Sequence, residues 1–246
     1  MQGPIQESDF LEILRVGVRR TVKFMGLLNE FHGGPAKTEY ILTTDIARAF
    51  LARHFEVRVE YLNRHFLNAM TRRRDWQPRQ EFGKMRTDVA VVEAGIIPRA
   101  IVEVKIGVGG TLTLIKEDLT KIASTMECMK TQVAANVRAA SVFQVHVRGR
   151  ANDLTIHRLM VKVNRIEAKL EAALKNFAMD WPDFTFRLVS LQDQRTGFVA
   201  TEILQEDDGT QSMGQNGHAT RYYAILISSN RRRKKAFTFR ERLYGD

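Results

Sequence analysis

Residues 86–107 read RTDVAVVEAGIIPRAIVEVKIG, and this stretch predicts the centre of the fold. Two runs rich in Val, Ile and Ala flank a short gap that contains glycine and proline, a pattern typical of a strand, a turn and a second strand. Asp88 lies inside the first run, and Glu103 and Lys105 lie inside the second. A hairpin that could have been wholly apolar therefore carries three charges, and these charges require an explanation.

The expected pairing of the hairpin brings the two carboxylates together. If the hairpin closes with Val92 opposite Arg99, antiparallel pairing places Asp88 opposite Glu103. Because side chains alternate between the two faces of a strand, Glu103 and Lys105 point to one side, and Asp88 shares that side. The apolar residues of both runs are divided between the two faces, which is typical of strands in the middle of a sheet.

The three charges favour a divalent cation. Carboxylates that face each other on a sheet repel and lose hydration, and Lys105 can neutralise only one of them. A divalent cation would neutralise both, and Mg²⁺ prefers hard oxygen ligands while it keeps several waters. Asp88, Glu103 and the main-chain carbonyl of Val104 are therefore candidate ligands for Mg²⁺, with Mn²⁺ as an alternative. The Lys105 ammonium could then orient an attacking water or stabilise charge on a phosphate.

Hydrophobic periodicity in the rest of the chain predicts an α/β protein. Apolar residues at helical spacing predict helices over residues 8–31, 38–53, 113–135 and 156–178. Further strands are expected over residues 55–62, 141–147, 184–191 and 221–228. The basic residues 70–84 and the Gly-, Asp- and Asn-rich residues 206–220 are expected to form loops. No repeat or linker divides the chain, so residues 1–246 are predicted to form one domain with a mixed central sheet.

The charge balance favours a nucleic-acid partner. The 246 residues carry a net charge of +10, which favours polyanions. Basic residues gather in two places, Arg72, Arg73 and Arg74 in the first, and Arg231, Arg232, Arg233, Lys234 and Lys235 in the second. The plainer interpretation is two solvated basic loops. An acidic membrane surface is less favoured, because no basic amphipathic anchor is evident.

The remaining composition favours the cytoplasm. No apolar run has the length of a membrane span, and the first residues, MQGPIQESDF, lack the layout of a secretory signal. The single cysteine, Cys128, has no partner for an intrachain disulfide and forms no cysteine-based metal site. We therefore expect a reducing compartment and no membrane association.

The predicted hairpin resembles the motif of the PD-(D/E)xK nuclease superfamily, with Asp88 on its first strand and Glu103-Val104-Lys105 on its second. The resemblance covers about residues 38–147 and implies the restriction-endonuclease-like αβββαβ core. The core elements would be residues 38–53, 55–62, 86–92, 99–107, 113–135 and 141–147. An extra N-terminal helix (8–31) and a C-terminal α/β extension (148–246) lie outside the resemblance.

The resemblance also implies roles for single residues. Asp88 and Glu103 would hold Mg²⁺ with the Val104 carbonyl, and Lys105 would position the water. A further ligand is expected on the first core helix, where Glu39 fits best, and Glu60 and Asp118 are accessory candidates. Thr87 stands where the motif has proline. Gln132 is followed four places on by Asn136 rather than tyrosine, which argues against the recombination-related exonuclease branches.

The function implied by the resemblance is a Mg²⁺-dependent nuclease that hydrolyses phosphodiester bonds, in its favoured form a DNA endonuclease. The two basic clusters would hold the nucleic-acid backbone, and a homodimer is expected from the resemblance alone. The alternative is a catalytically inactive nucleic-acid-binding or complex-forming protein with the same fold. Plainer interpretations of the single residues also stay open. Glu103 and Lys105 could form an ordinary ion pair, and Glu39 could be a first-turn helix residue favoured by the helix dipole. Glu60 could be a solvent-facing strand residue, and Asp118 could cap or solvate its helix.

Overall fold

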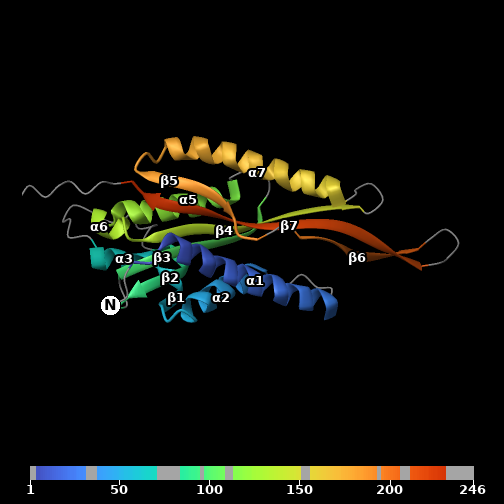
Figure 1. Ribbon diagram of the computed structural model, residues 1–246, viewed down its shortest axis with the longest axis horizontal. Coiled ribbons are helices and arrows are strands. Elements are labelled where there is room, and N and C mark those ends of the chain that lie inside the picture. Colours follow the sequence, from blue (N-terminus) through green and yellow to red (C-terminus); the bar gives the residue numbers. More distant parts are fainter. Residues whose placement is uncertain are drawn as a thin grey trace, which may run out of the picture.

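A mixed β-sheet runs through the centre of the computed structural model, and helices cover both of its faces (Figure 1). The structure describes residues 4–31, 38–70, 84–94, 97–108, 113–150, 156–192, 195–205 and 211–230. The helices are α1 (Glu7–Phe31), α2 (Thr38–Leu51), α3 (Asn63–Met70), α5 (Thr113–Cys128), α6 (Thr131–Ala134) and α7 (Ile156–Met179). The strands are β1 (Glu56–Leu62), β2 (Arg86–Glu93), β3 (Ile97–Val108), β4 (Arg138–Arg150), β5 (Phe184–Ser190), β6 (Arg195–Gln205) and β7 (Gln211–Ser229).

Six strands lie side by side in the order β1-β2-β3-β4-β7-β5, and β6 pairs with β7 outside this path. Among the described strands, β3 and β4 form the one parallel pair, and every other pair is antiparallel. The connection between β3 and β4 passes through α5 and α6, as a parallel pair requires a crossover. The molecule is therefore an α/β protein with a mixed sheet, as the sequence predicts.

The sheet is buried on both faces by two separate hydrophobic clusters. On one face α1 and α2 pack on the β2 and β3 valines, including Val89, Val91 and Val102. On the other face α5 and α7 pack on Ala90, Ile101 and their neighbours. This division of Val89 and Ala90 between the faces is the alternation expected of a central strand, and it confirms the face assignment made from the sequence.

Besides strand β6, for which the sequence predicts no strand, three parts of the secondary structure differ from the sequence-based expectation. Helix 113–135 is divided into α5 and α6, because Lys130 has extended backbone dihedrals (φ −54°, ψ 139°). Helix α3 follows β1 without a break, and most of the expected loop 70–84 lies outside the described residues.

The third difference concerns residues 206–220, of which the described part, 211–220, belongs to β7 rather than to a loop. These residues have low strand propensity, but their backbone pairs with β6 and, from Asn216 onwards, also with β4. Ladder pairing on two sides overrides the weak local preference. Near its start β7 extends with β6 beyond the helices as a two-stranded arm (Figure 1).

None of the helices in the described ranges is long and apolar enough to cross a membrane.

Candidate functional site

The β2–β3 pairing places Asp88 and Glu103 next to each other, as the sequence predicts. Val89 pairs with Val102 and Ala90 pairs with Ile101, so Asp88 and Glu103 are the next residues along this register. The predicted closure of the hairpin is wrong by one residue, because the register shifts between Val91 and Val92. A β-bulge at the turn end absorbs the extra residue and leaves the register near the charges unaffected.

Asp88 is held by a hydrogen bond to the neighbouring strand. The backbone N–H of Val104 donates to Asp88 Oδ2 at 2.7 Å. The β2–β3 pairs that the structure records end at Val89 and Val102, so the Asp88 carboxylate serves as the acceptor for β3 where the main-chain ladder stops. In an antiparallel pair the N–H and C=O of one residue face the same neighbour. The Val104 carbonyl is therefore expected to face the same gap between β2 and β3.

Glu103 is the most deeply buried acidic group of this region, with 1% of its surface exposed. Its Oε2 makes an ion pair with Lys121 Nζ from α5, whereas its Oε1 has no hydrogen-bond partner among the described residues. Burial raises the pKa of the Glu103 carboxyl well above its usual value. The positive charge of Lys121 opposes this rise in pKa, and the negative charges of Asp88 and Asp118 add to it.

Helix α5 brings Asp118 and Lys121 over this part of the sheet. Lys121 Nζ also donates to the main-chain oxygen of Arg86 at 2.8 Å, so one ammonium joins α5 to both β2 and β3. Burial raises the pKa of Asp118 to about 6; Lys121 and Lys105 oppose the rise, and Asp88 and Glu39 add to it. Asp118 Oδ2 is buried and has no hydrogen-bond partner within the described part of the chain.

Lys105 and Glu39 complete the group of charges. Lys105 follows Glu103 by two residues on β3 and is half-buried, and Glu39 lies half-buried in the first turn of α2. Both charges act on the pKa of Asp118, which indicates that α2, β3 and α5 bring them into one region. We call Glu39, Asp88, Glu103, Lys105, Asp118 and Lys121 the charged cluster.

Glu60 lies on β1, where the flanking pairs Val59–Val89 and Tyr61–Thr87 place it across from Asp88. Its side chain is exposed and its backbone is left-handed (φ 52°). A non-glycine residue in this conformation marks a local irregularity of the strand. Glu60 therefore disturbs the β1–β2 ladder at Asp88, and no recorded contact joins its carboxylate to the charged cluster.

Both basic clusters of the sequence, residues 72–74 and 231–235, lie outside the described residues. The expectation that they hold a nucleic-acid backbone therefore stays a prediction.

The charged cluster offers oxygen ligands to a cation, but its side chains do not form a complete coordination shell. Across the described ranges, no three His, Cys, Asp or Glu side chains converge in an arrangement that could hold a metal ion. Asp88 and Glu103 would be joined by the Val104 carbonyl and by waters, which suits the incomplete protein coordination typical of Mg²⁺. The unpartnered, buried Glu103 Oε1 fits a hard cation, because a buried carboxylate oxygen needs a positive or hydrogen-bonding partner.

Lys121 is the member of the charged cluster that sequence reasoning missed. Its position three residues after Asp118 on a predicted helix places both on one helix face, and Thr125 one turn later is also buried on that face. This spacing of polar residues toward the core was the available signal.

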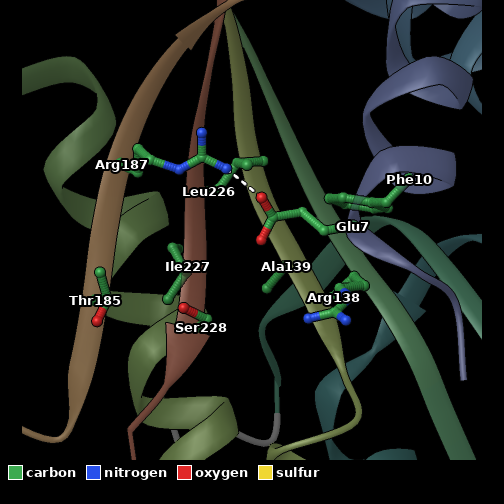
Figure 2. Close-up of a pocket in the computed structure, with 9 residues that line it drawn as sticks. All are labelled: Glu7, Phe10, Arg138, Ala139, Thr185, Arg187, Leu226, Ile227 and Ser228. Atoms are coloured by element: carbon green, nitrogen blue, oxygen red, sulfur yellow. Dashed lines mark hydrogen bonds and ion pairs between the residues drawn. The ribbon is translucent and has the colours of Figure 1, made fainter.

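A separate pocket lies on the opposite side of the sheet, beneath the start of α1 (Figure 2). Glu7 and Arg187 form an ion pair across it, and Arg138 Nε donates to the main-chain oxygen of Ile5 at 2.8 Å. Phe10 and Leu226, which also line the pocket, belong to the core beneath α1 and α2. The pocket thus belongs to the attachment of α1 to β4, β7 and β5, and it is distinct from the charged cluster.

Comparison of the chain with protein-family models, with curated proteins and with solved structures found no match.

Proposed function

We propose that the protein is a Mg²⁺-dependent nuclease that hydrolyses phosphodiester bonds, in its favoured form a DNA endonuclease with a restriction-endonuclease-like fold. The observation that carries the proposal is the buried Glu103 carboxylate beside Asp88 at the point where β2 and β3 separate. Lys105, two residues along the same strand, supplies a cation on the same face. Burying the Glu103 carboxylate with Oε1 unpartnered among the described residues, next to the half-buried Asp88, is unfavourable without a ligand, and a metal-dependent site would account for it.

The order of elements supports the same proposal. Helix α2, strands β1, β2 and β3, helix α5 and strand β4 follow one another in the order αβββαβ, with α3 and α6 as short additions. Within this order the candidate residues are distributed as the resemblance implies, with Glu39 on the first helix and Asp88 and Glu103 on successive strands.

In the proposed reaction each residue has a defined task. Asp88 and Glu103, with the Val104 carbonyl, would hold the metal ion, which supplies a Lewis acid and lowers the pKa of bound water. Lys105 would orient the attacking water and stabilise the negative charge that develops on the phosphate. Glu39 would hold a second ion or a water at the edge of the site. The basic clusters would hold the nucleic-acid backbone independently of sequence.

The ion pair between Lys121 and Glu103 favours a second candidate function. If Lys121 neutralises Glu103 permanently, no metal is needed, and the protein is a catalytically inactive nucleic-acid-binding or complex-forming protein with the same fold.

Cleavage of circular single- and double-stranded DNA in Mg²⁺, Mn²⁺ or EDTA distinguishes the two functions. We expect metal-dependent nicking or linearisation by the native protein, reduced at least about 100-fold in Asp88→Asn and in Lys105→Met, since each removes a group from the chemical step. Glu117→Gln, an exposed change on α5, serves as the charge-matched control for Asp88→Asn and should cleave normally. Full metal-dependent cleavage by both site variants would refute the proposal that Asp88 and Lys105 form the active site. Salt-sensitive DNA binding without cleavage by any of the proteins would establish the inactive alternative.

A further inference from the structure

We infer that Lys121 is a displaceable internal counter-ion, which occupies the cation position on Glu103 in the metal-free protein and moves to Asp118 when a divalent cation binds. This inference rests on the proposed metal site and adds to it a positioning residue that controls metal affinity.

The position of Lys121 is specific. Its side chain is 16% exposed, whereas the Glu103 side chain is 1% exposed, so the ion pair between them lies largely within the protein. The ammonium contacts Glu103 on β3 and donates to the Arg86 oxygen on β2 at 2.8 Å. Lys121 thus reaches from α5 into the place where β2 and β3 separate, which is where the proposed metal ion would be bound.

Lys121 and a metal ion would compete for Glu103. A divalent cation bound to this carboxylate would lie close to the Lys121 ammonium, and like charges at such short range in a partly dry site repel strongly. The buried Glu103 Oε1 has no hydrogen-bond partner in the described part of the chain, so a cation that reaches the charged cluster finds a ligand atom that the ion pair with Lys121 does not use. A lysine side chain can then move away because it has a flexible four-carbon stem.

Asp118 offers the new position for the ammonium. It lies three residues before Lys121 on α5, a spacing at which helical side chains are neighbours. Its Oδ2 is buried and unpartnered in the described structure, so an ammonium that leaves Glu103 would satisfy it. The exchange would leave Glu103 bound to the metal and Asp118 paired with Lys121. Each carboxylate would then have a cationic partner in the metal-bound state.

The test measures metal binding without DNA. Mn²⁺ is titrated into the native protein, Lys121→Met and Lys116→Met, and binding is followed by calorimetry and by the electron paramagnetic resonance of free Mn²⁺. Lys116 is an exposed lysine on the same helix, so its replacement removes the same charge away from the site. We expect the Mn²⁺ dissociation constant to fall at least about fivefold in Lys121→Met and to change less than about twofold in Lys116→Met. An unchanged or raised dissociation constant in Lys121→Met would overturn the inference.

A double-variant cycle tests where Lys121 goes. Asp118→Asn should weaken Mn²⁺ binding in the native background, because the ammonium loses its alternative partner, and should have little effect when Lys121 is already methionine. An equal effect of Asp118→Asn in both backgrounds would show only a long-range charge effect and would overturn the proposed exchange.

Lys121→Arg covers the case in which Lys121→Met does not fold. Arginine keeps the positive charge and can donate two hydrogen bonds to a carboxylate. Mn²⁺ should therefore bind more weakly to Lys121→Arg than to the native protein, and unchanged binding would contradict the inference. If the native protein binds no Mn²⁺ saturably, the metal site itself is absent, and the proposed function fails with the inference. Native Mn²⁺ binding that Lys121 variants leave unchanged refutes the inference alone.

Discussion

Replacement of Asp118 by asparagine should raise the free energy of unfolding at neutral pH and should raise it much less at pH 4. Burial raises the pKa of this carboxyl from 3.8 to about 6. The folded protein therefore binds the Asp118 proton more tightly than the unfolded chain does. Stability falls as the pH rises through this range, because deprotonation is easier in the unfolded state. Asparagine carries no proton to lose and lacks this penalty.

The magnitude follows from the size of the pKa shift. A rise from 3.8 to about 6 at about 1.4 kcal/mol per pH unit gives an upper value of about 3 kcal/mol. Solvent screens a partly exposed group, so we expect about 1–2 kcal/mol. The loss of stability in the native protein should begin above pH 4 and be complete near pH 7.

The assay is urea unfolding of the native protein and Asp118→Asn at several pH values between 4 and 7.5 without divalent cations. Glu117→Gln, the exposed neighbour on α5, is the control, and its difference from the native protein should stay within about 0.5 kcal/mol at every pH. The reasoning would be refuted if the difference between native protein and Asp118→Asn were the same at pH 4 and pH 7. Saturating Mg²⁺ should reduce the difference at pH 7, since a bound cation stabilises the ionised carboxylates.

Two further predictions concern the contact of α1 with α2 and the contact of β7 with α7. Gly17→Ala should lower the free energy of unfolding by about 1–3 kcal/mol, because an added Cβ would lie 2.8 Å from Ile46 Cγ1 and 2.9 Å from Ile46 Cα. Urea unfolding measures this loss, with the exposed change Arg20→Ala as the control. An equal or higher stability of Gly17→Ala would contradict the close α1–α2 contact. Tyr223→Phe should cost about 1 kcal/mol in urea unfolding, because the Tyr223 hydroxyl donates to Glu167 Oε2 at 2.9 Å and accepts a longer hydrogen bond from Arg221 Nη1 at 3.4 Å. The Arg221–Glu167 ion pair at 2.7 Å should persist in the variant, and a loss above about 3 kcal/mol would contradict this small contribution of the hydroxyl.

The sequence contains much of the charged cluster because its strands obey simple alternation. Asp88 and Glu103 could be placed together from the hairpin alone, since a period of two fixes the face of each residue and the runs are long enough to set the register. The one-residue shift beyond Val91 could not be predicted, because a bulge near the turn depends on backbone geometry that alternation of side chains does not encode.

The contribution of α5 was harder to predict than that of the hairpin. The ion pair between Lys121 and Glu103 depends on how the helix crosses the sheet, and hydrophobic periodicity gives the buried face of a helix without its position along the strands. The prediction of a loop over residues 206–220 is wrong for residues 211–220 for a related reason. Their strand conformation comes from pairing with the preceding strand β6 and with β4, which is distant in sequence, rather than from their own propensity.

The central place of β7 in the sheet has a consequence for the order of folding during synthesis. Ala139 of β4 pairs with Ile227 of β7, so one edge of β4 has no strand partner until nearly all of the described chain has been made. Contacts between residues so far apart form slowly, and the exposed edge is a site for aggregation in the meantime. The other edge of β4 pairs with β3, which carries Glu103 and Lys105. A nascent chain therefore holds its candidate catalytic residues well before β7 completes the sheet beside β4, and a chaperone that covers the open edge of β4 would protect the chain during that interval.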